Sequence, residues 1–223
     1  MRSQYAQLEW RDGAVPVSTR FDDPYFSLAG GLDETRHVFH AGNDLPARFQ
    51  GGFHIAELGF GTGLNFLATL QAWRTSGAQG KLRFTSFEAF PMAMPDLIRA
   101  LSHYPKLSVD VLIDKAAPKV IPRIEGADFT LTVIEGDARD TLPDWQGKAD
   151  AWFLDGFSPA KNPELWSPEL MAEVARHTAK GGTAATYTAA GFVRRGLEDA
   201  GFEVERTPGF GRKRHMTVAK LPE

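Results

Sequence analysis

The chain has 223 residues, and 25 Lys and Arg against 28 Asp and Glu give a formal net charge of −3. Its 43% hydrophobic and 24% charged residues are typical of globular proteins and exclude a disordered chain or a collagen-like fibre. Cysteine is absent, which excludes disulfides, thiolate metal sites and a Cys nucleophile. The N-terminus lacks the apolar segment of a signal peptide and no run of about 18 apolar residues occurs, so we expect a cytoplasmic protein without membrane contact.

The first 50 residues differ from the rest of the chain. Their short apolar runs are interrupted by Asp22-Asp23-Pro24, Gly30-Gly31 and Gly42-Asn43-Asp44, which are residue types that favour turns. We therefore expect an N-terminal lobe or β-rich lid over residues 1–50, followed by a second domain over residues 51–223.

From residue 53 onward, strand and helix patterns alternate. Apolar runs predict strands at Phe53–Leu58, Leu82–Phe87, Phe129–Ile134, Ala151–Leu154 and Thr183–Thr188. Helical spacing predicts helices at Leu64–Trp73, Pro95–His103, Pro168–Thr178 and Phe192–Ala200, with Gly181-Gly182 as the stop after the third. The end of the chain reads as a hairpin of Phe202–Arg206 and His215–Leu221. This alternation predicts an α/β fold with a mainly parallel sheet.

A glycine-rich loop, Glu57–Asn65, joins the first of these strands to its helix. Glycines allow a backbone to approach a ligand closely, and such sheets bind ligands at the carboxyl ends of their strands. Leu64 stands where a dinucleotide fingerprint needs its third glycine, and no Lys follows Gly63 as a P-loop requires. The pattern E-x-G-x-G-x-G instead resembles the first motif of class I S-adenosylmethionine-dependent methyltransferases. The resemblance implies a cofactor site that includes Glu57, Gly59, Gly61, Gly63 and Asn65.

Acidic residues follow the next three strands. Glu88 is placed to accept hydrogen bonds from ribose hydroxyls, unless it is a solvated loop acid. Asp137, beside Ala138, either accepts a hydrogen bond from the adenine amino group, as in methyltransferases, or caps a helix. Asp155 stands where many amino-group methyltransferases hold an Asp- or Asn-Pro-Pro-aromatic motif, although a helix-capping acid is the alternative.

Four blocks of sequence resemble the MnmC/MnmD-type tRNA wobble-uridine methyltransferases, in the order that this family has them. They are Pro24–Ser27 with Gly31–Thr35, Glu57–Phe66, the long block Ala151–Trp166 and Phe210–Met216. The resemblance implies a Rossmann-like class I fold with a mostly parallel seven-stranded sheet and an antiparallel last strand. It also implies methyl transfer from S-adenosylmethionine to the amine of 5-aminomethyl-2-thiouridine at the tRNA wobble position.

Asp155 is the candidate catalytic residue of this reaction, and it is also counted among the cofactor-binding residues. The attacking amine must be neutral, so a proton has to leave it, and Asp155 is placed to accept a hydrogen bond from the amine and help carry the proton off. Because an ordinary Asp has a pKa of about 3.9, we expect orientation of the amine to matter more than proton abstraction.

The same resemblance indicates the substrate site. An apolar wall around the uracil ring would be formed by Tyr25, Phe157, Pro159 and Trp166, although a core position for Trp166 is equally compatible with the sequence. Lys161 and Asn162 are candidate contacts to the tRNA backbone or the thiouridine edge, or else part of a surface turn. The cluster Arg212-Lys213-Arg214 is either a phosphate contact for the tRNA anticodon stem-loop or a solvated charged face.

The resemblance extends to the methyltransferase half of the family's fused bifunctional proteins, in which an FAD-dependent oxidase domain follows. No second dinucleotide fingerprint occurs in this chain. We expect either that a separate FAD-dependent oxidase supplies the aminomethyl substrate or that this substrate arrives directly from the preceding step.

His37 and His40 lack a third ligand at a suitable spacing, so we expect no metal.

Three alternatives remain at this point. A small-molecule (polyamine-like) amine methyltransferase or an aminopropyltransferase would use the same scaffold. A nicotinamide oxidoreductase is disfavoured by Leu64. A non-catalytic tRNA-binding module is disfavoured by the intact set of Gly59, Gly61, Gly63, Glu88 and Asp155.

Overall fold

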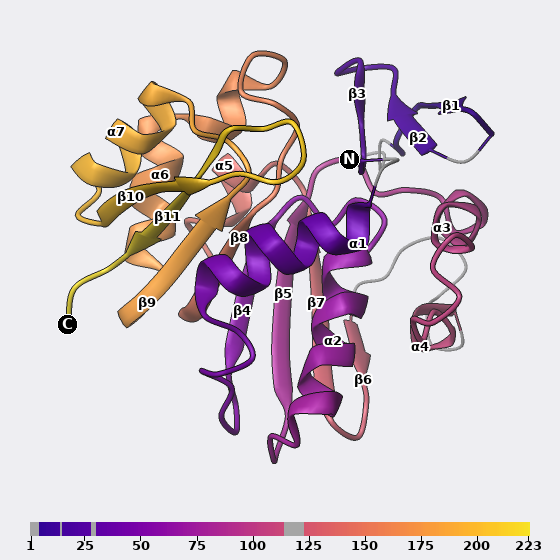
Figure 1. Cartoon of the computed structure of the whole chain (residues 1–223), viewed down its shortest axis with the longest axis horizontal. Coiled ribbons are helices and arrows are strands. Elements are labelled where there is room, and N and C mark those ends of the chain that lie inside the picture. The colour runs from indigo at the N-terminus through magenta and orange to yellow at the C-terminus, as the bar shows by residue number, and fades with distance from the viewer. Residues whose placement is uncertain (1–4, 14, 28–29, 114–122) are drawn as a thin grey trace.

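The protein is described by a computed structural model that places residues 5–13, 15–27, 30–113 and 123–223. A small antiparallel sheet is formed by β1 (Leu8–Arg11), β2 (Val15–Ser18) and β3 (Asp23–Pro24). A large sheet has the order β10-β11-β9-β8-β4-β5-β7-β6 (Figure 1). Its strands are β4 (His54–Leu58), β5 (Leu82–Glu88), β6 (Arg123–Glu125), β7 (Phe129–Glu135), β8 (Ala149–Leu154), β9 (Thr178–Thr186), β10 (Glu203–Pro208) and β11 (His215–Lys220).

The centre of the large sheet is parallel. The pairs β7–β5, β5–β4, β4–β8 and β8–β9 are all parallel, whereas β11 runs antiparallel to β9 and pairs with β10 as the predicted hairpin. The class I methyltransferase fold with its antiparallel last strand is therefore confirmed. The short strand β6 adds an eighth member at the edge, antiparallel to β7. With only three residues, it carries no apolar run that a sequence pattern would detect.

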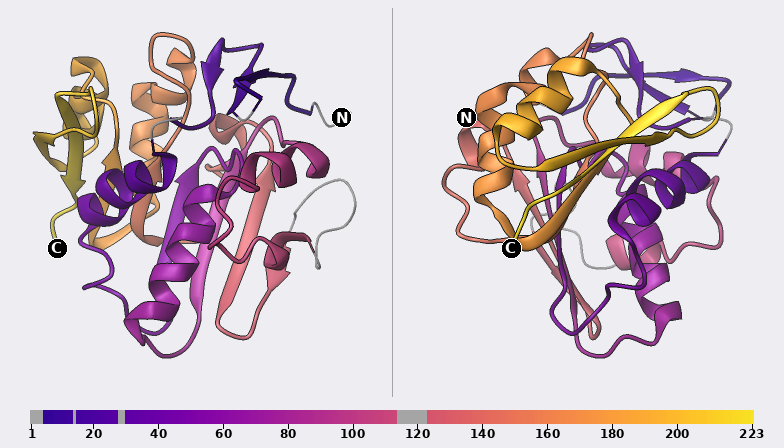
Figure 2. Two further views of the ribbon diagram at one scale, coloured as in Figure 1. Left: turned by 45° about the vertical axis from the view of Figure 1, so that its right-hand side comes forward. Right: turned by 60° about the vertical axis from the view of Figure 1, so that its left-hand side comes forward.

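Helices cover both faces of the sheet (Figure 2). They are α1 (Gly31–Glu34), α2 (Leu64–Ser76), α3 (Met94–Leu101), α4 (Asp110–Ile113), α5 (Ala138–Thr141), α6 (Pro168–Arg176) and α7 (Gly191–Asp199), with a short 3₁₀ turn at Pro163–Trp166. The core beneath α2 contains Phe66 and Trp73, and the core on the other face joins Trp152 to α6 and α7. None of the described helices is both long and apolar enough to cross a bilayer, and α2 has 13 residues.

The predicted helix Pro168–Thr178 ends two residues early, and the predicted stop at Gly181-Gly182 is wrong. Arg176 is the last residue of α6 and His177 is its C-cap, and Thr178 already pairs with Ala149 of β8. The pairing then skips to Thr183 opposite Ala151. The two glycines therefore lie within β9 at an irregularity of the ladder, where the left-handed φ of +69° at Gly181 favours glycine.

The N-terminal region is only partly β-rich. After β3, α1 continues into a π-helical turn, Thr35–His40, and a 3₁₀ turn, Ala41–Asn43, where the sequence analysis predicts no helix. Val38 and Phe39 of this segment belong to the same core as α2 and β4. Gly42 allows the close packing, because a Cβ there would lie 2.8 Å from the Cβ of Ala185.

Candidate functional site

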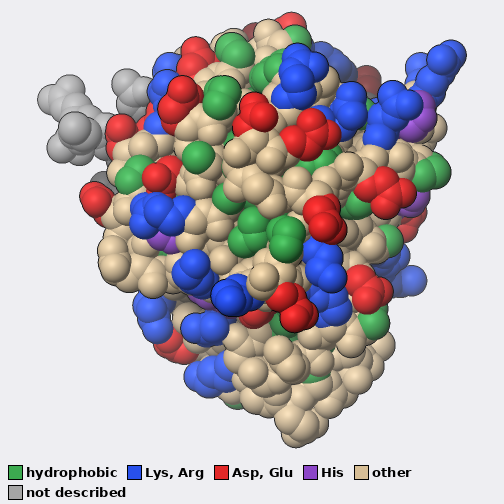
Figure 3. All heavy atoms as spheres, turned by 90° about the vertical axis from the view of Figure 1, so that its left-hand side faces the viewer, with side chains coloured by type: hydrophobic (Ala, Val, Ile, Leu, Met, Phe, Trp, Pro, Cys, Tyr) green, Lys and Arg blue, Asp and Glu red, His purple; other side chains and the backbone are tan. Residues whose placement is uncertain are grey.

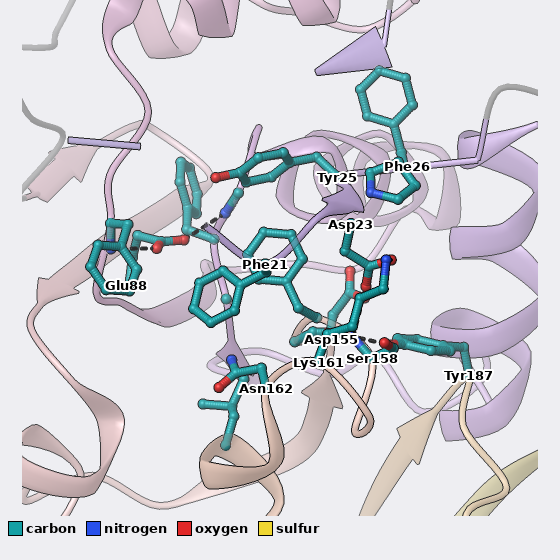
Figure 4. A pocket seen from close by; sticks show the side chains of 18 of the residues that line it. Phe21, Asp23, Tyr25, Phe26, Glu88, Asp155, Ser158, Lys161, Asn162 and Tyr187 are labelled. Atoms are coloured by element: carbon teal, nitrogen blue, oxygen red, sulfur yellow. Dashed lines mark hydrogen bonds and ion pairs between the residues drawn. The ribbon is translucent and has the colours of Figure 1, made fainter. Parts of the chain in front are cut away.

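A cavity of about 650 Å³ opens where the carboxyl ends of β4, β5 and β8 meet the β2–β3 region. This is the position in which parallel α/β sheets bind ligands, and its volume lies within the range of about 300–1,000 Å³ found for small-molecule sites. Figure 4 shows Glu88 on one side of the cavity, Asp155, Ser158 and Lys161 on the other, and Phe21 and Tyr25 between them. The predicted site residues that line it are Tyr25, Gly59, Gly61, Asn65, Glu88, Asp137, Ala138, Asp155, Phe157, Lys161, Asn162 and Lys213.

The glycine loop bends sharply around the floor of the cavity. Gly59, Gly61 and Gly63 all have positive φ, which strains any other residue. A Cβ on Gly59 would lie 2.6 Å from the main-chain carbonyl oxygen of Asp155, so the loop packs directly against the strand end that carries the candidate catalytic residue. Gly63 caps the N-terminus of α2 and lies below the cavity lining, against the ring of Phe60.

A buried hydrogen-bond network supports Asp155 from below. Glu57, 1% exposed, accepts hydrogen bonds from Ser86 Oγ at 2.7 Å and from Asn65 Nδ2 at 2.9 Å. Asn65 Nδ2 also donates to Asp155 Oδ2 at 2.6 Å, and Thr35 Oγ1 donates to Asn65 Oδ1 at 2.7 Å. Glu57 is thus buried beneath the cavity and acts on it through Asn65. Burial raises its pKa well above the ordinary range, although these hydrogen bonds oppose the shift.

Asp155 has a far more basic carboxylate than an ordinary aspartate. Its pKa is raised to about 7, mainly by burial and in smaller part by the charge of Glu34, while the hydrogen bond from Asn65 and the charge of Lys213 oppose the shift. The expectation of an ordinary pKa, and hence of a weak base, is therefore wrong. A pKa near neutrality suits a group that accepts a proton at physiological pH.

Glu88 ends β5 on the opposite side of the cavity. Its Oε2 accepts the Gly61 N–H at 2.9 Å, and its Oε1 accepts the Phe90 N–H at 2.8 Å. It is 8% exposed, and burial raises its pKa. The carboxylate also accepts a main-chain hydrogen bond from Phe60, so three amides fix its direction. A carboxylate has about four acceptor positions, so Glu88 can still accept a hydrogen bond from a ligand.

Asp137 caps a helix, which is one of the two roles that the sequence left open, and it also lines the cavity. Its Oδ1 accepts the Arg139 N–H at 2.9 Å and thereby caps α5. The Arg139 guanidinium lies 2.7 Å from Oδ2, and its hydrogen bonds lower the pKa of Asp137. Asp137 and Ala138 also line the cavity, so the capped turn faces it.

Aromatic rings close the cavity from the N-terminal side. Phe157 is stacked on Phe21 with ring centroids 4.7 Å apart and meets Tyr25 edge-on at 5.1 Å. Trp166 is not part of this wall: it is 1% exposed, and its Nε1 donates to the Phe157 carbonyl at 2.9 Å, so it supports the wall from the core. Pro159 is also buried, outside the set of lining residues.

Lys161 is engaged within the protein. Its ammonium hydrogen-bonds to the main-chain carbonyl of Asp22 and lies 3.2 Å from Asp22 Oδ2 and 3.8 Å from Asp23 Oδ1. Asp23 Oδ2 also accepts the Ser158 N–H at 2.8 Å. These contacts fasten the β2–β3 region to the loop after β8. Lys161 therefore faces residues of the chain itself, while Asn162 lines the cavity beside it.

The three basic residues of the β10–β11 turn, Arg212, Lys213 and Arg214, differ in whether they line the cavity. All three are exposed, but only Lys213 lines the cavity. Its Nζ lies 2.7 Å from Glu34 Oε1 and 3.9 Å from the centroid of the Tyr187 ring. Arg212 and Arg214 lie outside the cavity lining. Figure 3 shows that basic and acidic side chains alternate on the adjoining face, which carries α7 and β10, so this face is not a continuous basic surface.

Sequence reasoning missed several lining residues, namely Phe21, Asp23, Glu34, Thr35 and Tyr187. A signal was available for the last three. Glu34 and Thr35 end the block Gly31–Thr35 that resembles the family, and Tyr187 follows β9 at the same edge of the sheet as Asp155. Among the described residues, no group of His, Asp and Glu is arranged to hold a metal ion.

These features define a nucleotide-type cofactor site. They are a parallel sheet, a three-glycine loop after one strand, an acid at the end of the next strand, and a cavity beside both. Residues 107–222 match the family profile described as S-adenosyl-L-methionine-dependent methyltransferase, and the chain belongs to that family. Its cofactor is accordingly S-adenosylmethionine.

More specific similarity comes from full-length relatives. The chain is 44% identical over 232 residues to the tRNA 5-methylaminomethyl-2-thiouridine biosynthesis bifunctional protein MnmC of Stutzerimonas stutzeri, which covers 98% of this chain and 35% of that protein. It is 48% identical over 225 residues to the MnmC of Pseudomonas aeruginosa, covering 96% of this chain and 34% of that one. The chain thus spans about a third of the length of these relatives.

Solved structures agree with this assignment. The crystal structure of MnmC2 from Aquifex aeolicus is 27% identical and superimposes with a TM-score of 0.75 over all of this chain and 73% of that one. A class I S-adenosylmethionine-dependent methyltransferase structure from Listeria monocytogenes, 10% identical, matches with a TM-score of 0.53 over 93% of this chain and 63% of that one, which shows the common fold.

Proposed function

We propose that the protein transfers a methyl group from S-adenosylmethionine to the amine of 5-aminomethyl-2-thiouridine at the tRNA wobble position, which gives 5-methylaminomethyl-2-thiouridine. The observation that carries the proposal is the position of Asp155. It lies in the block 151–166 that resembles the family, at the floor of the cavity, between the glycine loop and the aromatic wall. The names of the relatives point to the same product.

The residues present fit the cofactor. The backbone of Gly59 and Gly61 leaves space that a side chain would fill, and the remaining acceptor capacity of the Glu88 carboxylate suits a ribose hydroxyl. The turn at Asp137 and Ala138 would face the adenine ring. When bound, S-adenosylmethionine supplies an electrophilic methyl group on a sulfonium sulfur, so the protein has mainly to align the amine and remove its proton.

Asp155 performs the proton step. A primary ammonium cannot attack, so Asp155 accepts one of its protons. A hydrogen bond from the resulting amine to Asp155 then keeps the nitrogen lone pair directed at the methyl carbon. The glycine loop and Glu88 would hold the cofactor, which would give up its methyl group to the nitrogen and be released as S-adenosylhomocysteine. The hydrogen bond from Asn65 at 2.6 Å fixes which way the carboxylate faces.

The remaining contacts concern the tRNA. Phe157 and Tyr25 would pack against the uracil ring, because unpaired bases are commonly recognised by stacking on aromatic side chains. Arg212 and Arg214 are exposed at the rim and would contact phosphates of the anticodon stem-loop. We propose that the protein acts in the cytoplasm and receives its aminomethyl substrate either from an FAD-dependent oxidase or directly from the preceding modification step.

The test is a methyl-transfer assay with labelled S-adenosylmethionine and tRNA that carries 5-aminomethyl-2-thiouridine, followed by nucleoside analysis. We expect labelled 5-methylaminomethyl-2-thiouridine, and none from the same tRNA with an unmodified wobble uridine. Transfer to free polyamines, with none to the modified tRNA, would instead establish the small-molecule amine methyltransferase.

A further inference from the structure

Lys213 is one of the basic side chains that line the cavity. Lys213 comes from the β10–β11 turn, and its ammonium lies against two groups that the cofactor site does not use. Glu34 Oε1 is 2.7 Å away, and the Tyr187 ring centroid is 3.9 Å away. A carboxylate beside an aromatic face is a suitable environment for an alkylammonium ion.

Both groups are held in place independently of Lys213. The Glu34 side chain is 16% exposed, and Glu34 continues into the π-helical turn at Thr35, which is tied to Asn65. The Tyr187 hydroxyl donates to the Gly156 carbonyl at 2.8 Å, which fixes the ring beside the residue that follows Asp155. The arrangement is therefore a preformed site for a cation rather than a contact created by the lysine.

The position of this site relates it to the reaction. Glu34 and Lys213 are both close enough to Asp155 to change its pKa, and all three line the cavity. The substrate in the proposed function carries a primary alkylamine, which is largely protonated at neutral pH. Such an ammonium has the same chemistry as the end of the Lys213 side chain.

We propose that Glu34 and Tyr187 form the subsite for the protonated aminomethyl group of the substrate, and that Lys213 occupies this subsite until the substrate displaces it. The inference rests on the proposed function and deepens it. A uridine without an amine cannot displace Lys213, so the subsite selects the aminomethyl base before chemistry begins. The arriving ammonium lies beside Asp155, which then takes its proton.

Displacement of Lys213 is physically reasonable. One cation replaces another, so Glu34 remains paired and the charge of the cavity is unchanged. The Lys213 side chain is 45% exposed, and Arg212 and Arg214 flank it on an exposed turn. Once released, Lys213 joins these two residues at the rim, where phosphates of the bound RNA would neutralise it.

The test compares two anticodon stem-loops that differ only in the amine. One carries 5-aminomethyl-2-thiouridine and the other 5-methyl-2-thiouridine, and their dissociation constants are measured with protein saturated with S-adenosylhomocysteine. The ratio of the two constants is the amine preference. We expect Lys213→Met to increase this preference roughly tenfold, because a hydrogen bond to a charged group typically contributes that much and the competing cation is gone. We expect Glu34→Gln to reduce the preference to nearly one.

Arg214→Met is the matched control, since it removes a neighbouring cation of the same turn that lies outside the cavity. It should weaken both stem-loops equally and leave the amine preference unchanged. If Lys213→Met behaves like this control, Lys213 is only a phosphate contact or a structural tie, and the inference is wrong. An unchanged amine preference in folded Glu34→Gln protein would also overturn the inference. If the Glu34→Gln variant does not fold, the result for Lys213→Met alone decides whether the inference holds. Failure of the wild-type protein to methylate the aminomethyl RNA would instead refute the proposed function itself.

Discussion

The cavity has a floor and a roof that are built in different ways. The floor consists of Glu57, Asn65, Glu88 and Asp155, at the ends of parallel strands or at the start of α2. Glu57 and Glu88 are buried and Asp155 is half-buried, and all three carboxylates accept hydrogen bonds from residues of the main fold. The roof, residues 20–27, contains strand β3 of the small N-terminal sheet and the residues on either side of it. It is fastened by exposed or half-exposed groups, among them the Lys161–Asp22 ion pair.

This difference separates chemistry from access. Breaking a buried network leaves an unsatisfied polar group, which costs about 1–3 kcal/mol or more, whereas an exposed ion pair contributes about 0.2–1 kcal/mol. The floor is therefore fixed by the fold, whereas the exposed Lys161–Asp22 ion pair contributes little to holding the roof in place. Changes in the floor should affect turnover and cofactor binding, and changes in the roof should affect RNA entry.

The largest effect is expected from the floor at Asp155. Asp155→Asn keeps the size of the side chain and its ability to accept the hydrogen bond from Asn65, but it cannot take a proton. We expect single-turnover methyl transfer to fall about 10²–10⁴-fold, the usual contribution of general-base catalysis. S-adenosylhomocysteine affinity, measured by calorimetry, serves as the control and should change little. Near-normal transfer by this variant would show that Asp155 does not act as the base.

The same substitution should stabilise the protein at alkaline pH. The pKa of Asp155 is raised to about 7 in the folded protein, so the unfolded chain loses this proton first, and the group lowers stability as pH rises from about 4 to 7. Asp155→Asn removes this penalty. At pH 8 we expect a gain on the order of 1–4 kcal/mol in the free energy of unfolding, measured by urea denaturation. The gain should disappear near pH 4, and a gain independent of pH would contradict the assigned ionisation.

Glu88 tests the cofactor side of the floor. Glu88→Gln retains one acceptor oxygen but loses the charge that orders the Gly61 and Phe90 amides. We expect S-adenosylhomocysteine affinity to fall about tenfold, since a charged hydrogen bond contributes about 1.5–3 kcal/mol. Affinity for the aminomethyl stem-loop should be nearly unchanged. Equal losses for both ligands would mean that floor and roof are not separable.

The smallest effect is expected from the roof. Asp22→Ala and Lys161→Ala, combined in a double-mutant cycle, should give a coupling energy of only about 0.2–1 kcal/mol in thermal or urea unfolding, because the Asp22 side chain is 85% exposed. We expect the association rate of the stem-loop to change more than cofactor affinity does. A coupling of several kcal/mol would show that the roof is as rigid as the floor.

The sequence was sufficient for the floor and much less so for the N-terminal region. The strands β4 and β8 are mostly apolar runs, β7 alternates apolar and polar residues, and strand ends carry glycines or acids, so both fold and cofactor loop could be predicted. The helical segment 31–43 could not, because its glycines indicate turns and only packing against the sheet makes it helical. The raised pKa of Asp155 was likewise inaccessible, since it depends on burial.

Two residues that the sequence predicts to contact the substrate show the same limit. Trp166 has the composition of a stacking residue, but tertiary packing places its ring in the core and directs Nε1 to the Phe157 carbonyl. Lys213 belongs to a basic cluster, yet sequence gives its charge and not its direction, which the turn between β10 and β11 determines. Trp166 therefore supports the aromatic wall from the core, whereas Lys213 lines the cavity.

The contact between Gly59 and the Asp155 carbonyl has a consequence for engineering. A cofactor analogue with a larger transferable group needs extra room in the cavity. That room cannot be gained at position 59, because the main chain of Asp155, the candidate catalytic residue, lies directly against it. At Gly61 the nearest neighbour is the Tyr25 ring, 3.2 Å from where a Cβ would lie. Variants that accept bulkier alkyl donors should therefore be sought by trimming Tyr25, on the side of the cavity that the small N-terminal sheet provides.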